Sequence, residues 1–187
     1  MIETILTLST GENIYVYDKV FTPSQAECIR DITEQSYYKL GTVSNVTVNE
    51  RQSTFFQSIY NQDDVKKLKM YESENFQKIA RQHFTSLVPT RQWVNVSTHF
   101  SDYRFHTDSS ELFCISLLIY TNTRWDTDWG GETIFKNGNG DVEIAVEYKP
   151  NRVVIFNSNL SHKPTLISIK SDPFRFIFVQ QYNKQVG

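Results

Sequence analysis

The sequence predicts a mainly β domain with flanking helices, an α+β arrangement, and three observations support this expectation. Short apolar runs, typical of buried strands, recur between residues 92 and 182. Two segments with helical spacing precede them, within residues 22–88. No repeat, low-complexity tract or Pro/Gly/Ser-rich linker divides the chain, so we expect a single domain over residues 1–187.

A strand and then a helix are expected near the start of the chain. Residues 12–20 alternate sufficiently to form a strand. Thr22 is then a suitable N-cap, Pro23 a suitable first helical residue, and Gln25 stands at the position that completes a capping box. The stripe that this helix should bury consists of Ala26, Ile29 and Ile32. We expect the helix to end near residue 40, with Gly41 as its stop signal.

A second helical segment is predicted over residues 63–86, ahead of Pro89. Its apolar positions keep an approximately helical spacing and are Val65, Leu68, Phe76, Ile79, His83 and Leu87. We expect both helices to cover one outer face of the sheet. Between the helices, residues 41–51 are polar and β-branched, and residues 52–60 have the pattern of a strand.

Four further strands are expected in the second half of the chain. Continuous apolar runs cover residues 114–120 and 153–156, and residues 175–182 are mostly apolar after the first position. A short strand over residues 132–135 follows a Gly-Gly pair, Gly130-Gly131, which allows a tight turn or a close approach of the backbone.

A His-x-Asp pair and a later histidine have the chemistry of a metal site. In an extended strand, side chains at i and i+2 point to the same face, so His106 and Asp108 can both be directed at one ion. His162 follows the apolar run 153–156 and reaches the same ion from a separate strand. Two imidazoles and one carboxylate form the facial triad that holds non-haem Fe(II) and leaves positions open for a cosubstrate and dioxygen.

A cation stands at the beginning of the last apolar strand. Arg175 needs an acidic partner or an acidic ligand, because burying an unpaired guanidinium is costly. Tyr120 ends the apolar run 114–120 and is placed to add a phenolic hydrogen bond to the same anion. Arg175 and Tyr120 therefore either meet an acidic side chain of the protein or form an anion-binding pair.

These motifs occur in a recognisable order along the chain. The order is His106-x-Asp108, the strand ending at Tyr120, Asn122, Trp125-Asp126, Gly130-Gly131-Glu132, residues 152–156, His162 and Arg175. It resembles the 2-oxoglutarate and Fe(II)-dependent dioxygenases, specifically their prolyl 4-hydroxylase-like branch. The resemblance implies a double-stranded β-helix, a jelly-roll or cupin-like barrel, with the metal-binding core mostly in residues 92–182 and helical support mostly in residues 22–88.

The resemblance also implies an enzyme that binds Fe(II) through His106, Asp108 and His162. 2-Oxoglutarate would chelate the iron, and its far carboxylate would meet Arg175 and Tyr120. The reaction implied is hydroxylation of a prolyl residue in a peptide or protein, with decarboxylation of 2-oxoglutarate to succinate and CO2 and with ascorbate as a further cofactor. Two alternatives stay open: hydroxylation of a free amino acid or other small molecule, and a non-catalytic, cupin-like metal-binding protein.

Some positions depart from the pattern of the family or need a separate interpretation. Collagen-type prolyl hydroxylases usually have lysine where Arg175 stands, whereas arginine is typical of the hypoxia-factor and bacterial enzymes. A tyrosine that often precedes the His-x-Asp motif corresponds to Phe100, which has no hydroxyl, so Tyr103 and His99 are the candidate replacements. His83 lies on the apolar face of a helix and is expected to be a core or half-buried histidine.

Candidate substrate-side residues lie in two segments. In the family that the chain resembles, the region of residues 41–51 tends to be a lid over the substrate, which makes Asn45, Asn49 and Arg51 candidates; a solvated hairpin is the alternative. Trp125 and Trp129 lie on a loop near the metal, where they either grip the substrate or pack the loop on the barrel rim. The apolar walls expected to exclude water are Leu117, Ile119, Ile155 and Ile177.

The composition argues against several classes of partner. A formal net charge of −2, with 39% hydrophobic and 21% charged residues, is ordinary for a globular enzyme and gives no basic stripe for nucleic acid. No apolar stretch is long enough to cross a bilayer, and the first residues lack the features of a signal peptide. We therefore expect a cytoplasmic enzyme with a peptide or small-molecule substrate and with no nucleic-acid or membrane partner.

Overall fold

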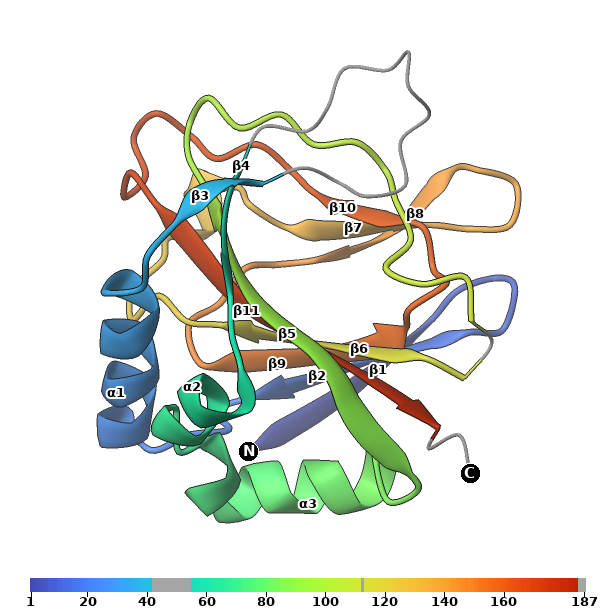
Figure 1. Ribbon diagram of the computed structural model, residues 1–187. Coiled ribbons are helices and arrows are strands. Elements are labelled where there is room, and N and C mark those ends of the chain that lie inside the picture. Colours follow the sequence, from blue (N-terminus) through green and yellow to red (C-terminus); the bar gives the residue numbers. More distant parts are fainter. Residues whose placement is uncertain (42–54, 112, 185–187) are drawn as a thin grey trace.

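Two antiparallel β-sheets pack against each other, and helices cover one outer face of the larger sheet (Figure 1). The computed structural model describes residues 1–41, 55–111 and 113–184. This architecture confirms the predicted mainly β class with flanking helices. Within the described ranges, no helix is both long enough and apolar enough to span a membrane.

The larger sheet has eight strands in the order β1-β2-β9-β6-β11-β5-β4-β3. Their bounds are β1 Ile2–Thr7, β2 Asn13–Asp18, β3 Lys39–Gly41, β4 Phe55–Ile59, β5 Leu87–Ser97, β6 Ile115–Tyr120, β9 Arg152–Asn157 and β11 Arg175–Lys184. The smaller sheet, ordered β10-β7-β8, contains β7 Thr133–Lys136, β8 Val142–Val146 and β10 His162–Pro164. The strand predicted over residues 12–20 is β2, whereas the sequence analysis missed β1, whose side chains are almost all exposed.

Helix α1 (Pro23–Glu34) begins where the sequence predicted and ends earlier. Thr22 and Gln25 form the expected capping box, with Pro23 in the first turn. The prediction that the helix continues to about residue 40 is wrong, because the chain turns into β3, which pairs with β4. Gly41 therefore belongs to a strand and is not the helix stop.

The second helical segment is broken into three pieces. They are α2 (Gln62–Lys67), the 3₁₀ turn η1 (Met70–Glu72) and α3 (Glu74–His83). Lys69 adopts a left-handed conformation between the first two pieces, and the Ser73 side chain caps α3 by accepting a hydrogen bond from the backbone N–H of Phe76. The helical spacing correctly predicted which side chains are buried, since Val65 and Ile79 are buried. The prediction of one continuous helix over residues 63–86 is wrong.

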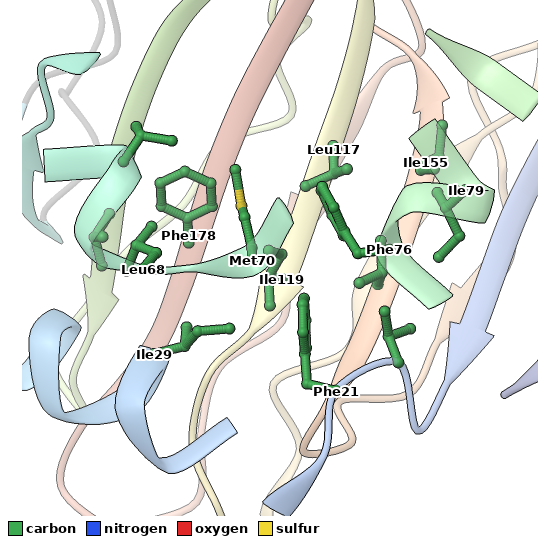
Figure 2. Close-up of a cluster of buried hydrophobic side chains, with 14 of the residues drawn as sticks. Phe21, Ile29, Leu68, Met70, Phe76, Ile79, Leu117, Ile119, Ile155 and Phe178 are labelled. Atoms are coloured by element: carbon green, nitrogen blue, oxygen red, sulfur yellow. The ribbon is translucent and has the colours of Figure 1, made fainter. Parts of the chain in front are cut away.

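The helices pack on the larger sheet through a continuous apolar core (Figure 2). Members from the helical side are Phe21, Ile29, Leu68, Met70, Phe76 and Ile79, and members from the sheet are Leu117, Ile119, Ile155 and Phe178. Three of the walls expected around the metal, Leu117, Ile119 and Ile155, thus face the helices and not the site. An apolar run that is buried on both faces does not reveal which alternate residues point to which side.

The opposite face of the larger sheet forms a second core with the smaller sheet. Its members include Trp93, Leu118, Tyr120, Ile177 and Val179 from the larger sheet. Phe135 and Val146 contribute from β7 and β8, and the 3₁₀ turn η2 (Thr127–Trp129) lies on the loop between β6 and β7. This second core is the layer in which the functional site lies.

Candidate metal centre and anion pocket

The His-x-Asp pair lies in an extended segment that belongs to neither sheet. The prediction of a strand around this pair is therefore wrong. A single antiparallel β-bridge, between His106 and His162, is present instead. The backbone N–H groups of His106 and His162 each donate to the carbonyl of the other, at 3.0 and 2.9 Å. The backbone N–H of Asp108 donates to the carbonyl of Ser158 at 2.9 Å. These bonds bring two distant segments of the chain to one point.

The three predicted ligands converge as the sequence analysis expected. The Asp108 carboxylate lies 3.7 Å from the Nε2 atom of His106 and 3.7 Å from that of His162. All three donor atoms lie within 4.8 Å of one another, which is close enough to share one ion.

The orientation of both rings also suits a metal. The Nδ1 atoms of His106 and His162 lie 3.1 and 2.9 Å from the carbonyl oxygens of Arg104 and Leu160. Metal-binding histidines typically use one ring nitrogen in this way, which leaves Nε2 for the ion. Burial lowers the pKa of His162 to about 4, so its imidazole is neutral, as a ligand must be. This set of donors fits Fe(II).

A cavity between the two sheets opens onto the triad. Its lining contains Phe55, Trp93, Asn95, Ser97, Tyr103, Leu118, Thr133, Pro164, Arg175, Ile177 and Val179 in addition to the three candidate ligands. The apolar part of this lining includes Leu118 of β6 and the alternate β11 residues Ile177 and Val179. Of the four walls predicted from the sequence, Ile177 alone lines this cavity.

Arg175 lies in this cavity as a buried cation whose guanidinium is incompletely hydrogen-bonded. Its side chain is almost fully buried, with 1% of its surface exposed. In the part of the chain that the structure describes, Nε and Nη2 have no hydrogen-bond partner. The guanidinium lies 4.7 Å from the ring centre of Tyr148 and 5.6 Å from that of Tyr120. Because an unpaired buried charge is costly, this arrangement is suited to an anionic ligand such as a carboxylate.

The aromatic rings beside Arg175 are neutral phenols. Burial raises the pKa of both Tyr120 and Tyr148, and the nearby guanidinium only partly opposes this effect. The two rings stack at 4.4 Å, and the Tyr120 hydroxyl lies 2.8 Å from the Thr133 hydroxyl. Tyr120 is therefore close to Arg175 as expected, and its hydroxyl is connected to the cavity wall through Thr133. The sequence analysis did not single out Thr133 or Tyr148.

Gly131 allows the backbone to approach Arg175 closely, as the Gly-Gly pair predicted. A Cβ atom at this position would lie 2.9 Å from Cδ of Arg175 and 3.0 Å from its Nε. The φ angle of Gly131 is +81°, a value that favours glycine. Its backbone N–H donates to the hydroxyl of Thr165 at 3.0 Å, which fixes the loop at this point.

Phe100, Tyr103 and His99 were considered at the position of the tyrosine that often precedes the His-x-Asp motif in the family. Of these three residues, Tyr103 lines the cavity. It is buried in the cavity lining, and its hydroxyl donates to the Ser97 hydroxyl. Phe100 is highly exposed, and the half-buried His99 lies 3.2 Å from the Ser171 hydroxyl through its Nε2 atom. Neither of these two residues is part of the cavity lining.

The structure describes two of the candidate substrate-side residues, Trp125 and Trp129. The Trp125 indole N–H donates to the carbonyl of Gly130 at 2.9 Å, and its ring packs against Trp129 and Tyr148. These are packing contacts, and neither tryptophan lines the cavity. Asn45, Asn49 and Arg51 lie outside the described residues, so their role stays a prediction.

Comparison with known proteins identifies the family of this site. The sequence model of the 2OG-Fe(II) oxygenase superfamily matches residues 92–179, the segment that contains the triad and Arg175. This segment belongs to that superfamily. The His106, Asp108 and His162 triad is accordingly that of an Fe(II)- and 2-oxoglutarate-dependent oxygenase. Among curated proteins, none matches the chain.

Solved structures share the oxygenase fold at low sequence identity. A Trichoplax adhaerens prolyl hydroxylase in complex with a hypoxia inducible factor peptide is 16% identical, with a TM-score of 0.66 over 91% of this chain and 83% of that one. A Pseudomonas putida prolyl-4-hydroxylase is 12% identical, with a TM-score of 0.69 over 93% and 94%. HygX from Streptomyces hygroscopicus, with nickel and 2-oxoglutarate bound, is 12% identical, with a TM-score of 0.65 over 92% and 83%. These similarities confirm the double-stranded β-helix.

Proposed function

We propose that this oxygenase hydroxylates a prolyl residue in a peptide or protein and converts 2-oxoglutarate to succinate and CO2. The observation that carries the proposal is the buried guanidinium of Arg175, in the same cavity as the metal triad, whose Nε and Nη2 atoms have no hydrogen-bond partner among the described residues. A purely structural metal site has no use for such a cation, whereas a diacid cosubstrate does. The prolyl substrate is supported by two of the structural relatives, which are prolyl hydroxylases.

Each group in the cavity has a defined task in this proposal. His106, Asp108 and His162 hold Fe(II), and the bound iron with 2-oxoglutarate supplies the activation of dioxygen. Arg175 binds the far carboxylate of 2-oxoglutarate through charge-assisted hydrogen bonds, and Tyr120 supports that anion together with Thr133. The apolar wall that Leu118, Ile177 and Val179 form excludes water from the reacting atoms.

The substrate would enter beside the polar and aromatic part of the lining. Phe55 stacks on Tyr103 there, and the Gln57 amide N–H donates to the Asn95 side-chain oxygen at 3.1 Å. Paired amides of this kind suit hydrogen bonding to a peptide group. Asn49 and Arg51 are proposed as outer substrate contacts, and ascorbate as a reductant that maintains the iron in its ferrous state.

Mass spectrometry of a substrate panel tests this function. Proline-containing peptides and free amino acids would be incubated with the enzyme, Fe(II), 2-oxoglutarate and ascorbate, and searched for a gain of about 16 Da, the mass of one inserted oxygen. We expect the gain on prolyl peptides together with release of succinate. A gain confined to free amino acids would overturn the peptidyl assignment.

The same assay with the His162→Ala variant is the control for the metal centre. Removing one of three ligands should abolish 2-oxoglutarate decarboxylation, because the iron loses an anchor that no other group replaces. If the variant retained its turnover, His162 would not be a ligand. If the unmodified protein bound metal but released no succinate with any substrate, the chain would be a non-catalytic metal-binding protein.

A further inference from the structure

Two buried serines lie behind the carboxylate of Asp108. Ser116 is on β6 and Ser158 follows β9, and both have no exposed surface. The Ser116 hydroxyl donates to Oδ2 of Asp108 at 2.6 Å, and the two serine hydroxyls lie 2.8 Å apart. Ser116 is a single polar residue in an otherwise apolar run, so its burial is costly unless its hydroxyl is bonded.

The direction of these hydrogen bonds follows from the chemistry of the groups. An ionised carboxylate only accepts, so the one proton of Ser116 is directed to Asp108. The bond between the serines must then use the proton of Ser158, with the oxygen of Ser116 as acceptor. Successive hydroxyls that donate in one direction strengthen one another, and the last bond, to a charged oxygen, is the strongest.

The backbone around Asp108 is fixed by the same elements. The carbonyl of Ser158 accepts from the backbone N–H groups of Asp108 and Ser109, at 2.9 and 3.1 Å. The amide of Gln181, on β11, donates to the carbonyl of Asp108 at 3.0 Å. Because the segment of Asp108 belongs to neither sheet, the bonds from Ser158 just after β9, from Gln181 on β11 and from the Ser116 hydroxyl on β6 attach it to the larger sheet.

We propose that Ser116 is a positioning residue for the metal ligand Asp108 and that Ser158 supports it. The hydroxyl of Ser116 holds the carboxylate in the orientation in which Oδ1 lies 3.7 Å from Nε2 of His106 and Oδ2 lies 3.7 Å from Nε2 of His162. A carboxylate that turned freely about its last torsion would lose this fixed orientation and would bind a metal ion less tightly. This inference rests on the metal role of the triad in the proposed function.

Binding of Co(II) in the absence of 2-oxoglutarate tests the proposal. We expect Ser116→Ala to weaken Co(II) affinity by roughly 10- to 100-fold, the usual effect of removing a group that orients a ligand. The visible absorption of bound Co(II) should also change, because it reports the number and arrangement of the ligands. Ser158→Ala should have a smaller effect in the same direction.

The double variant distinguishes a relay from two independent packing contacts. If Ser158 acts through Ser116, then Ser116→Ala with Ser158→Ala should bind Co(II) no more weakly than Ser116→Ala alone. Fully additive losses would overturn the relay. Ser58→Ala, at a buried serine on β4, is the matched control and should leave both affinity and absorption unchanged.

Two outcomes would overturn the positioning role itself. One is a folded Ser116→Ala protein, as judged by its thermal melting without metal, with unchanged Co(II) affinity and absorption. If Ser116→Ala does not fold, the Ser158→Ala variant provides the test. Unchanged Co(II) affinity and absorption in Ser158→Ala would then overturn the positioning role. An unmodified protein that binds no Co(II) would contradict the metal centre, and with it the proposed function.

Discussion

At the scale of single residues, the site depends on charged groups that the protein itself leaves incompletely paired. Arg175 is surrounded by the rings of Tyr120 and Tyr148, which attract a cation weakly but supply no negative charge. Its guanidinium is therefore prepared for an acid that comes from outside the protein. Binding of such an acid would offset the cost of keeping the guanidinium buried.

Replacing this cation should change cosubstrate binding selectively. Arg175→Ala should raise the KM for 2-oxoglutarate by roughly ten- to a hundredfold, because a hydrogen bond to a charged group contributes about 1.5–3 kcal/mol. The concentration of Fe(II) needed for activity should change far less. The measurement is succinate release at varied 2-oxoglutarate and at varied iron.

Arg124→Ala is the matched control for this variant. Arg124 is an exposed arginine that already pairs with Asp172, at 2.6 Å, so its loss should leave the KM for 2-oxoglutarate unchanged. Equal effects in the two variants, or an unchanged KM in Arg175→Ala, would remove Arg175 from the cosubstrate site.

The sequence allowed prediction of residues whose chemistry is specific and whose spacing is local. The His-x-Asp pair, the later histidine and an arginine at a strand start are of this kind, and the structure brings all four into one cavity. Thr133, Tyr148 and Ser116 were missed because ordinary threonine, tyrosine and serine have no distinctive spacing. Their partners come from strands that are far apart in the sequence, so only the strand order places them in the site.

At the scale of elements, local signals predicted where helices begin better than where they end. The capping box at Thr22 and Gln25 is a contact between neighbours in the sequence, and it is present. The end of α1 depends on the pairing of β3 with β4, which no local pattern reports. The same limit explains the walls of the site, because the face to which Leu117 and Leu118 point is decided by the packing of whole layers.

The turn at Gly131 provides a prediction at this scale. Gly131→Ala should raise the KM for 2-oxoglutarate, because a methyl group there would displace the Arg175 side chain from its present position. Co(II) affinity should be little affected, since the triad lies on other segments. The two quantities can be measured by succinate release and by titration with the metal.

Gly140→Ala separates the contact from the strain of the backbone. Gly140 has a similar φ angle, +88°, but a Cβ there would meet no atom within 4 Å. Its replacement should therefore cost stability alone, about 1 kcal/mol as in other positive-φ positions. If both variants changed the KM equally, the close approach to Arg175 would not be the reason for a glycine at 131.

At the scale of the whole molecule, the site lies where the larger sheet, the smaller sheet and the segment between β5 and β6 meet. His162 belongs to β10 of the smaller sheet, Arg175 belongs to β11 of the larger one, and His106 and Asp108 lie in the segment between β5 and β6. A metal ion held by the triad, and a diacid that reaches from it to Arg175, would link these parts. Such ligands bind the folded chain and not the unfolded one, so they should raise its stability.

Thermal melting with Mn(II), a redox-stable substitute for Fe(II), tests this linkage. At a hundredfold excess over its Kd, a ligand adds about 2.7 kcal/mol, which for a chain of this length corresponds to roughly 5–10 °C in Tm. We expect such a rise with Mn(II), and a further rise with 2-oxoglutarate only when the metal is present. His162→Ala should lose both increments, whereas Arg175→Ala should keep the first and lose most of the second. Equal stabilisation by 2-oxoglutarate with and without Mn(II) would mean that the diacid binds elsewhere, because chelation of the ion is what makes its binding depend on the metal.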